Sequence, residues 1–412
     1  MEEAHRFKWI YILLILTFSS ILLIVLGNIL LSPRELVTIK IFYGAHYFVP
    51  EANSFRNLVD RWNELYFRKE GFQVEIVDID REDFLVNIVA SNSQEVDLVF
   101  LTNFNIGLLA DKLEPLDSIL RQKAQDFYSP ALESVKVNES IYGLPLHTVV
   151  PVLVYRGRDI SNPPENWKEF KAIAKNFTRI FNPNSPTSYG AAIYCLPGVH
   201  GGVMLHSIMN SIGGDISLRN LTRTIGSLKL TFQLYLDLFS EGMMPANMSS
   251  YEWTTMMRRF EANEFPMMIG WSGLLEEMNV DDVKIAPIPV GEDGIQRNAR
   301  IYVIALGIPR SSTHKNEAFK FLSTLLEGSL LEEMLDLGYV PPLKSLLLNS
   351  KFPLRDQLSE ILEHSAAPAI NIKRSKDLYV SLSIITEWVI DKRITLAEAS
   401  KMADLELRKI MP

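Results

Sequence analysis

The sequence predicts an α/β fold preceded by one N-terminal transmembrane helix. Apolar runs of strand length alternate with stretches of helical period along most of the 412 residues, which favours helices layered on a sheet over a bundle or a sandwich. Residues 9–33 contain no charged side chain and are numerous enough to cross a bilayer once as a helix. No later apolar run approaches that length. We therefore expect one membrane anchor and one water-facing body.

The charges that flank the apolar run predict its orientation. Arg6 and Lys8 precede it, and basic residues favour the cytoplasmic side. Residues 1–8 are then a cytoplasmic stub, residues 9–33 a signal anchor, and the body lies on the extracellular side of the cell membrane. The alternative is a cleaved secretory signal, which usually has a shorter apolar region and a small-residue cleavage site. This run is long and lacks such a site, so we expect the anchor to stay uncleaved.

Composition excludes several classes of protein. The formal net charge is −8 and no basic run is present, so we expect no nucleic-acid partner. A single cysteine rules out stabilisation by disulfides within the chain, and stability must come from core burial. Cys195, in the segment AAIYCLP, is expected to be a buried small hydrophobic residue.

The first part of the body contains repeated strand–helix units. The pattern predicts strands at residues 37–44, 72–79 and 97–103, a helix over 53–67 and another from residue 83. Such units require a parallel sheet. In open parallel sheets ligands bind beyond the carboxyl ends of the strands. The expected ligand-binding residues in these positions are Tyr43, His46, Asn103, Phe104 and Asn105.

The second part begins after an extended stretch at residues 142–155, whose composition suits a link between two lobes. Residues 161–175 predict a proline-rich turn followed by an amphipathic helix that opens a new domain. The chain returns to strand character at 299–309, continues with a helix over 317–328, and turns at 338–343. More than one crossing between lobes is expected.

Eight segments in order carry a family resemblance over nearly all of residues 37–412. They are WNE at 62–64, EVDLVFL at 95–101, LLADKLEPLDSIL at 108–120, IYGLPLHTVVPVLVY at 141–155, PENWKEF at 164–170, SIGGDI at 211–216, FPMMIGWSG at 265–273 and LGYVPPLKS at 337–345. In these segments the chain resembles the extracellular solute-binding proteins of ABC importers, specifically the class that includes maltose and oligosaccharide binders.

The resemblance implies a two-lobed periplasmic-binding-protein-like fold of type II. The expected N-terminal lobe comprises residues 36–147 and 302–335, and the C-terminal lobe comprises residues 152–300 and 338–412. Hinge bending would close the lobes over a ligand in the cleft between them. The implied function is the substrate-binding component of an ABC transporter, which captures an extracellular solute, expected to be a sugar or oligosaccharide, and delivers it to permease subunits.

The resemblance also implies which aromatic residues stack on a sugar ring. Trp271 matches the family's stacking aromatic, Tyr339 stands where another often lies, and Tyr251 and Trp253 form a weaker pair. Stacking suits sugars because one face of the ring is apolar while its rim carries hydroxyls. The alternative for Trp271 is a core residue, but it follows a predicted strand and precedes a loop-like Ser-Gly pair, which favours the cleft.

Polar ligand contacts are expected from loops and strand ends. The candidates are His46, Asn103, Asn105, His147, His200, His206, Glu261 and Arg300. After the third strand the family's maltodextrin binders have an aromatic and charged residues, whereas this chain has Leu101, Thr102, Asn103 and Phe104. That departure argues against maltose itself as the ligand.

Catalysis is not expected. The sequence contains no H-E-x-x-H, G-x-x-x-x-G-K-[ST], G-x-S-x-G or C-x-x-C motif, so it offers no common metal, phosphate or nucleophile site. No cofactor and no metal are predicted. Two alternatives to sugar import remain. One is a receptor of the same fold for a non-sugar solute, and the other is a sensory or adhesion ectodomain that is not coupled to import.

Overall fold

The computed structural model describes residues 17–20, 36–44, 52–79, 82–216, 220–275, 278, 281–291, 298–327, 330–335, 340–368 and 374–410. Within these ranges no helix combines the length and apolarity needed to cross a membrane. The predicted anchor at residues 9–33 lies outside the described residues except for positions 17–20.

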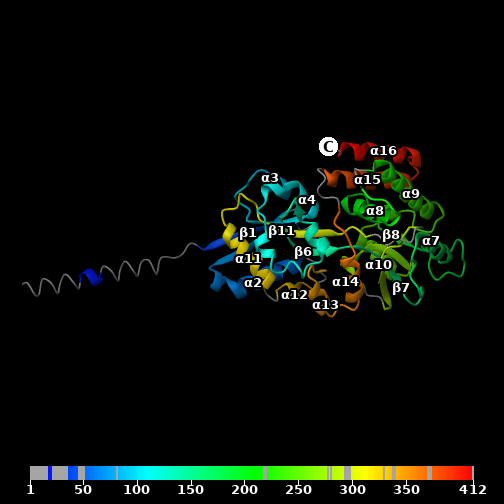
Figure 1. Ribbon diagram of the computed structural model, residues 1–412. Helices are drawn as coiled ribbons and strands as arrows, with labels where there is room; N and C mark the ends of the chain where they lie inside the picture. Colours follow the sequence, from blue (N-terminus) through cyan, green and yellow to red (C-terminus); the bar gives the residue numbers. More distant parts are fainter. Residues whose placement is uncertain are drawn as a thin grey trace, which may run out of the picture.

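A five-stranded sheet forms the centre of the first lobe (Figure 1), in the order β2-β1-β3-β11-β6. Its strands are β1 (Val37–Gly44), β2 (Phe72–Ile79), β3 (Leu98–Thr102), β6 (Leu144–Val149) and β11 (Tyr302–Gly307). Strand β1 is parallel to β2 and β3, as the sequence predicts. Strand β11 is antiparallel to β3 and β6, so the five-stranded sheet as a whole is mixed. The reason is that the chain enters β11 from the second lobe, at the opposite end of the sheet.

Helices cover both faces of this sheet, with α3 and α4 on one side and α2 and α12 on the other (Figure 1). The helical and short elements of the first lobe are α2 (Ala52–Glu70), α3 (Glu82–Ala90), α4 (Asn103–Leu109), η2 (Ala110–Lys112), α5 (Asp117–Leu120), α6 (Ser129–Glu133), the hairpin β4 (Lys136–Val137) and β5 (Ser140–Ile141), α11 (Lys315–Glu327) and α12 (Leu330–Leu335). Trp62 of α2 is fully buried, and its indole N–H donates to Thr324 Oγ1 of α11 at 2.7 Å. The apolar face of α2 thereby joins a sequence-distant helix to the core.

A four-stranded sheet, in the order β10-β7-β9-β8, forms the centre of the second lobe. Its strands are β7 (Pro151–Arg156), β8 (Ala192–Ile193), β9 (Met267–Trp271) and β10 (Val283–Ala286). The surrounding elements are α7 (Trp167–Asn176), α8 (Val199–Ser211), α9 (Leu221–Ser240), η3 (Met248–Ser250), α10 (Trp253–Glu261), η4 (Ser272–Leu274), α15 (Ser375–Ile390) and α16 (Leu396–Lys409). Cys195 is buried in this lobe, as predicted.

The described elements pass from one sheet to the other from β6 to β7 through Val150, which is the first crossing, and return from β10 to β11, which is the second crossing. Helices α13 (Lys344–Asn349) and α14 (Arg355–Glu363) follow α12 and precede α15. Helix α14 contacts both α6 of the first lobe and β10 of the second. The two lobes are therefore joined by several segments rather than by one linker.

Candidate functional site

The two sheets meet end to end at the first crossing. Tyr302 of β11 is paired with Val149 of β6, and Trp271 of β9 is paired with Pro151 of β7. Val149 and Pro151 are separated by one residue, Val150, so their Cα atoms lie within about 7 Å of each other. Tyr302 and Trp271 consequently flank the same short connection from opposite lobes.

Six rings from both lobes gather at this place, and we call them the junction cluster: Phe104 and Tyr302 from the first lobe, and Tyr194, His200, Trp271 and Tyr379 from the second. The ring centroids of His200 and Tyr302 are 4.4 Å apart, and those of His200 and Trp271 are 5.8 Å apart. The Phe104 ring lies 6.0 Å from that of Tyr302 in the same lobe and 5.2 Å from that of Tyr379 in the other lobe. Tyr194 lies 6.4 Å from Trp271. These ring contacts join the lobes at two points.

Local structure explains how the second-lobe rings are placed. Helix α8 begins after Gly198, whose φ of +142° is a conformation that side chains disfavour, and His200 lies in the first turn. Gly202 packs so closely on α15 that an added Cβ would lie 2.2 Å from the carbonyl oxygen of Tyr379. The close approach of α8 and α15 brings His200 and Tyr379 to the same end of the lobe.

A buried histidine lies beside the crossing on the first-lobe side. His147 Nδ1 accepts a hydrogen bond from the backbone N–H of Val340 at 3.1 Å. Burial lowers the pKa of His147 to about 3, so the ring is neutral at physiological pH. A Cβ added to Gly273 would lie 3.5 Å from His147 Nε2 and also 3.5 Å from the Trp253 ring. Side chains of both lobes thus converge on Gly273.

His206 links Tyr379 of the junction cluster to a charged pair formed by Asp215 and Arg300. His206 Nδ1 lies 2.7 Å from the Tyr379 hydroxyl, and Nε2 lies 3.0 Å from Asp215 Oδ1. A carboxylate only accepts hydrogen bonds, so Nε2–H donates to Asp215 and Nδ1 accepts from Tyr379. Arg300 Nη2 donates to the same carboxylate oxygen at 2.7 Å.

The pKa values of this group follow from burial and pairing. Desolvation by burial, together with the Arg300 charge, lowers the pKa of His206 to about 4. The hydrogen bond from His206 and the nearby Arg300 charge lower the pKa of Asp215 to about 2. At neutral pH the group therefore consists of a neutral imidazole and one compensated ion pair.

The structure places the predicted site residues in several different surroundings. Phe104, His200 and Trp271 belong to the junction cluster, and His147 and Trp253 lie beside it around Gly273. Asn103 and Asn105 are buried at the start of α4, next to Phe104. His46 and Tyr339 lie outside the described residues.

The remaining candidates have partners within one lobe. The Tyr43 ring stacks on Phe55 in the first-lobe core, at a centroid distance of 5.8 Å. Tyr251 packs under the Arg259 guanidinium, and its hydroxyl donates to Asn247 Oδ1. The Glu261 carbonyl accepts from Arg156.

Two further candidates, His206 and Arg300, belong to the Asp215 group rather than to the cluster. Arg300 is fixed on its other side as well, because Nη1 donates to the Ala367 carbonyl. His206 holds the Tyr379 ring of the junction cluster, and the Arg300 charge is paired with Asp215.

Three rings of the junction cluster were not predicted from the sequence: Tyr194, Tyr302 and Tyr379. Tyr302 is the first residue of β11, directly after the second crossing, and an aromatic at such a strand start is a usable signal. Tyr194 and Tyr379 reach the junction only through tertiary packing. Their positions in the sequence carry no comparable mark.

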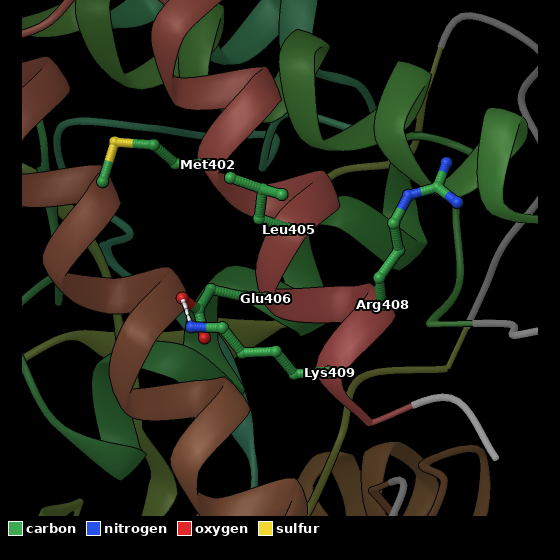
Figure 2. A pocket seen from close by; sticks show the side chains of 5 residues that line it. All are labelled: Met402, Leu405, Glu406, Arg408 and Lys409. Carbon is green, nitrogen blue, oxygen red and sulfur yellow. Dashed lines mark hydrogen bonds and ion pairs between the residues drawn. The ribbon is translucent and has the colours of Figure 1, made fainter.

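A separate hollow of about 400 Å³ lies on α16, at the outer side of the second lobe (Figure 2). It is lined by Met402, Leu405, Glu406, Arg408 and Lys409. Glu406 is paired with Lys409, and Arg408 with Asp404. The hollow contains none of the predicted site residues. Helix α15 packs against both α16 and α8, so it lies between the hollow and the junction cluster.

Two features of the described residues bear on metal binding and on nucleophile chemistry. Across the described ranges no three His, Cys, Asp or Glu side chains are arranged to hold a metal ion. Burial raises the pKa of the Cys195 thiol, which opposes formation of a nucleophilic thiolate. The arrangement instead provides aromatic faces and neutral polar groups between two lobes, which suits reversible binding.

The chain has recognisable relatives in sequence and in structure. The family model described as bacterial extracellular solute-binding protein matches residues 49–327. The maltotriose-binding protein of Pyrococcus abyssi is 24% identical over 294 residues, which cover 66% of this chain and 61% of that protein. The chain thus spans less than two thirds of that relative's length.

Solved structures share the fold at low sequence identity. The maltose-bound MalE3 of T. maritima superposes with a TM-score of 0.78 at 20% identity, covering 91% of this chain and 100% of the other. A solute-binding protein of an ABC transporter from Thermotoga lettingae, bound with α-D-tagatose, has a TM-score of 0.74 at 20% identity, covering 91% and 99% of the two chains. These similarities show the two-lobed α/β fold of periplasmic binding proteins.

Proposed function

Because the chain belongs to the family of bacterial extracellular solute-binding proteins, we propose that it captures a sugar, polyol or oligosaccharide between its lobes and delivers it to the permease of an ABC importer. The observation that carries the proposal is the junction cluster, in which His200 of one lobe contacts both Trp271 of the same lobe and Tyr302 of the other. Rings from two lobes at one hinge suit a ligand that is held from both sides.

The chemistry of the cluster fits a carbohydrate. Aromatic faces pack against the apolar C–H face of a sugar ring, and neutral polar groups around them satisfy its hydroxyls. The ligands in two of the similar solved structures, maltose and tagatose, support this class, as does the name of the maltotriose-binding relative. We propose Trp271, His200, Tyr302 and Phe104 as ligand-contacting residues, with His147 and Trp253 at the edge of the site.

Closure of the lobes provides the mechanism. We propose lobes at residues 36–147 with 302–335 and at residues 152–300 with 338–412, with the segment around Val150 as a hinge. A ligand that contacts both lobes binds the closed state better than the open state and shifts the population toward closure. A permease that recognises the closed shape would then accept loaded receptors in preference to empty ones.

Attachment to the membrane completes the proposal. The charge-free run at residues 9–33 would hold the binding domain at the extracellular face, close to its permease. Extraction of cell membranes with alkaline carbonate tests this part, because an integral anchor keeps the full-length chain in the pellet. A chain that lacks residues 1–34 should appear in the supernatant.

The test of binding is a series of thermal melts of residues 36–412 against mono- and oligosaccharides and polyols. Peptides, polyamines and metal salts serve as contrast. A ligand at a hundred times its Kd adds about 2.7 kcal/mol of stability, which is readily seen as a rise in Tm. A saturable rise with one saccharide class supports the proposal. A rise only with charged solutes would favour a non-sugar receptor, and no rise with any solute would favour a sensory or adhesion ectodomain.

A further inference from the structure

We propose that the side-chain amide of Asn103 and the indole N–H of Trp271 are hydrogen-bond donors to the ligand, one from each lobe, and that they select a neutral ligand rich in hydroxyl oxygens. The inference rests on the proposed function. It goes further because it assigns particular atoms as donors and excludes cationic solutes.

The orientation of the Asn103 amide is fixed by a backbone contact. Asn103 is fully buried, and its Oδ1 accepts from the Val303 N–H at 3.2 Å. A backbone N–H requires an oxygen acceptor, so the amide cannot be flipped without losing this bond. Nδ2 therefore points away from Val303, and it has no hydrogen-bond partner within the described part of the chain. A buried donor in that state is costly unless something accepts from it.

The indole N–H of Trp271 likewise differs from the N–H groups of two other buried tryptophans, which have hydrogen-bond partners. Trp62 donates to Thr324 Oγ1 at 2.7 Å, and Trp167 donates to Ser211 Oγ at 2.9 Å. Trp271 is only 6% exposed, yet its Nε1 has no hydrogen-bond partner among the described residues. Buried tryptophans usually find a partner for this N–H. The indole N–H groups of Trp62 and Trp167 are hydrogen-bonded, whereas that of Trp271, at the junction, is not.

Both donors flank the same hinge. Val303, which holds Asn103, directly follows Tyr302 of the junction cluster in β11, and Trp271 is itself a member of the cluster. Asn103 also directly precedes Phe104, whose ring contacts Tyr302 and Tyr379. One donor thus belongs to each side of the connection through Val150. An oxygen-rich ligand at the junction would accept from both lobes at once.

The surrounding charges favour a neutral ligand. An ammonium group has no lone pair and cannot accept from either donor, so a polyamine at this position would leave both donors unsatisfied. An anion buried here would need a countercharge. The Arg300 guanidinium is already paired with Asp215 and bonded to the Ala367 carbonyl. His147 is neutral at physiological pH because burial lowers its pKa. Hydroxyl oxygens need only neutral donors of this kind.

Two substitutions test the donors separately by calorimetric titration with the saccharide that raises Tm most. Asn103→Asp keeps an oxygen for the Val303 N–H and replaces the donor with an acceptor, so the affinity should fall at least about tenfold. Trp271→Phe keeps an aromatic face and removes only the N–H, so the affinity should fall about three- to tenfold. Trp167→Phe is the matched control, since it removes an indole N–H that is bonded elsewhere and should leave the affinity unchanged.

Acid rescue adds a readout that a merely structural role would not produce. A protonated carboxyl can donate, so Asn103→Asp should recover affinity relative to wild type as the pH falls toward about 5. Wild type and Trp271→Phe should show no such relative gain. If wild type binds a saccharide and both variants bind it within about twofold of wild type, the donor assignment is overturned while the proposed function stands. If wild type binds no saccharide, both are overturned.

Discussion

Ser272 holds Val150 by two hydrogen bonds. The Ser272 N–H donates to the Val150 carbonyl at 3.0 Å, and the Ser272 hydroxyl accepts from the Val150 N–H at 3.0 Å. Val150 is the middle residue of the first crossing, and Ser272 directly follows Trp271. The first crossing is therefore fixed to the end of β9, where Trp271 of the junction cluster lies.

Loss of this hydroxyl should weaken the hinge. Ser272→Ala leaves the buried Val150 N–H without its acceptor, and we expect the free energy of unfolding to fall by about 1–3 kcal/mol. Urea denaturation measures the change. Ser240→Ala serves as the control, because that hydroxyl is exposed and bonds only within α9, so its effect should stay within about 0.5 kcal/mol. Equal effects in the two variants would show that Ser272 has no special role.

Gly273 should be intolerant of a side chain because of its neighbour across the hinge. An added Cβ would lie 2.7 Å from Val149 Cγ1, which forces the two lobes apart or shifts the valine. We expect Gly273→Ala to lower saccharide affinity at least about tenfold. The double variant Gly273→Ala/Val149→Ala should recover much of that loss, since it removes the clashing methyl. Calorimetric titration of both variants decides the matter, and an unrecovered loss would count against the steric explanation.

A second glycine should behave in the opposite way. Gly226 lies inside α9 with open space around its Cα, so Gly226→Ala meets no obstacle. Alanine is favoured over glycine in a helix by about 0.5–1 kcal/mol, and we expect a stability gain of that size with unchanged affinity. A melt that shows destabilisation would contradict the packing described for α9.

Stability should fall as the solution is acidified below about pH 6.5. His147 and His206 have folded-state pKa values lowered to about 3 and about 4 from an ordinary value of 6.5. Above pH 6.5 neither the folded nor the unfolded state binds these protons, and the full stability is present. Between pH 6.5 and about 4 only the unfolded state binds them, so each histidine costs up to about 1.4 kcal/mol per pH unit.

The Asp215 carboxyl continues this trend at lower pH, because its folded-state pKa is also lowered. His147→Asn keeps an acceptor for the Val340 N–H and removes one titrating group. We expect its unfolding free energy to depend less steeply on pH than that of wild type. Urea denaturation at several pH values between about 4 and 7 measures the two slopes, and identical slopes would show that His147 does not titrate as described.

Truncation of Trp271 tests the aromatic contribution as a whole. We expect Trp271→Ala to weaken saccharide binding by about 1–3 kcal/mol while the protein still folds. Tyr251→Ala is the control, because this aromatic packs on Arg259 and bonds to Asn247 within the second lobe. Calorimetric titration compares the two variants. A variant at Trp271 that fails to fold would identify the indole as a core residue rather than a ligand contact.

Local pattern predicted the elements well where one face of a strand or helix is buried. The strand at residues 72–79 coincides with β2, and the helix over 53–67 lies within α2, because their hydrophobic periods are set by the first-lobe core. The orientation of β11 could not be predicted in this way. Its direction depends on the chain's return from the second lobe, which leaves no mark in the strand's own sequence.

The site was less accessible to sequence reasoning than the fold. Phe104, His200 and Trp271 were nominated from strand ends, loops and family resemblance, and the structure brings them together with Tyr302 and Tyr379. The last two were missed because their role arises only when distant segments pack. Tyr43 and Tyr251 have equally favourable positions in the sequence, yet their rings pack within single lobes.

Hydrogen–deuterium exchange with the strongest-binding saccharide tests most directly whether one ligand is held by both lobes at the junction. We expect the saccharide to protect backbone amides in three places: around β9 and η4, in the first turns of α8, and at the start of α4 and β11. These segments come from both lobes. Protection confined to one lobe, or centred on α16, would contradict a binding site at the hinge between Tyr302 and Trp271.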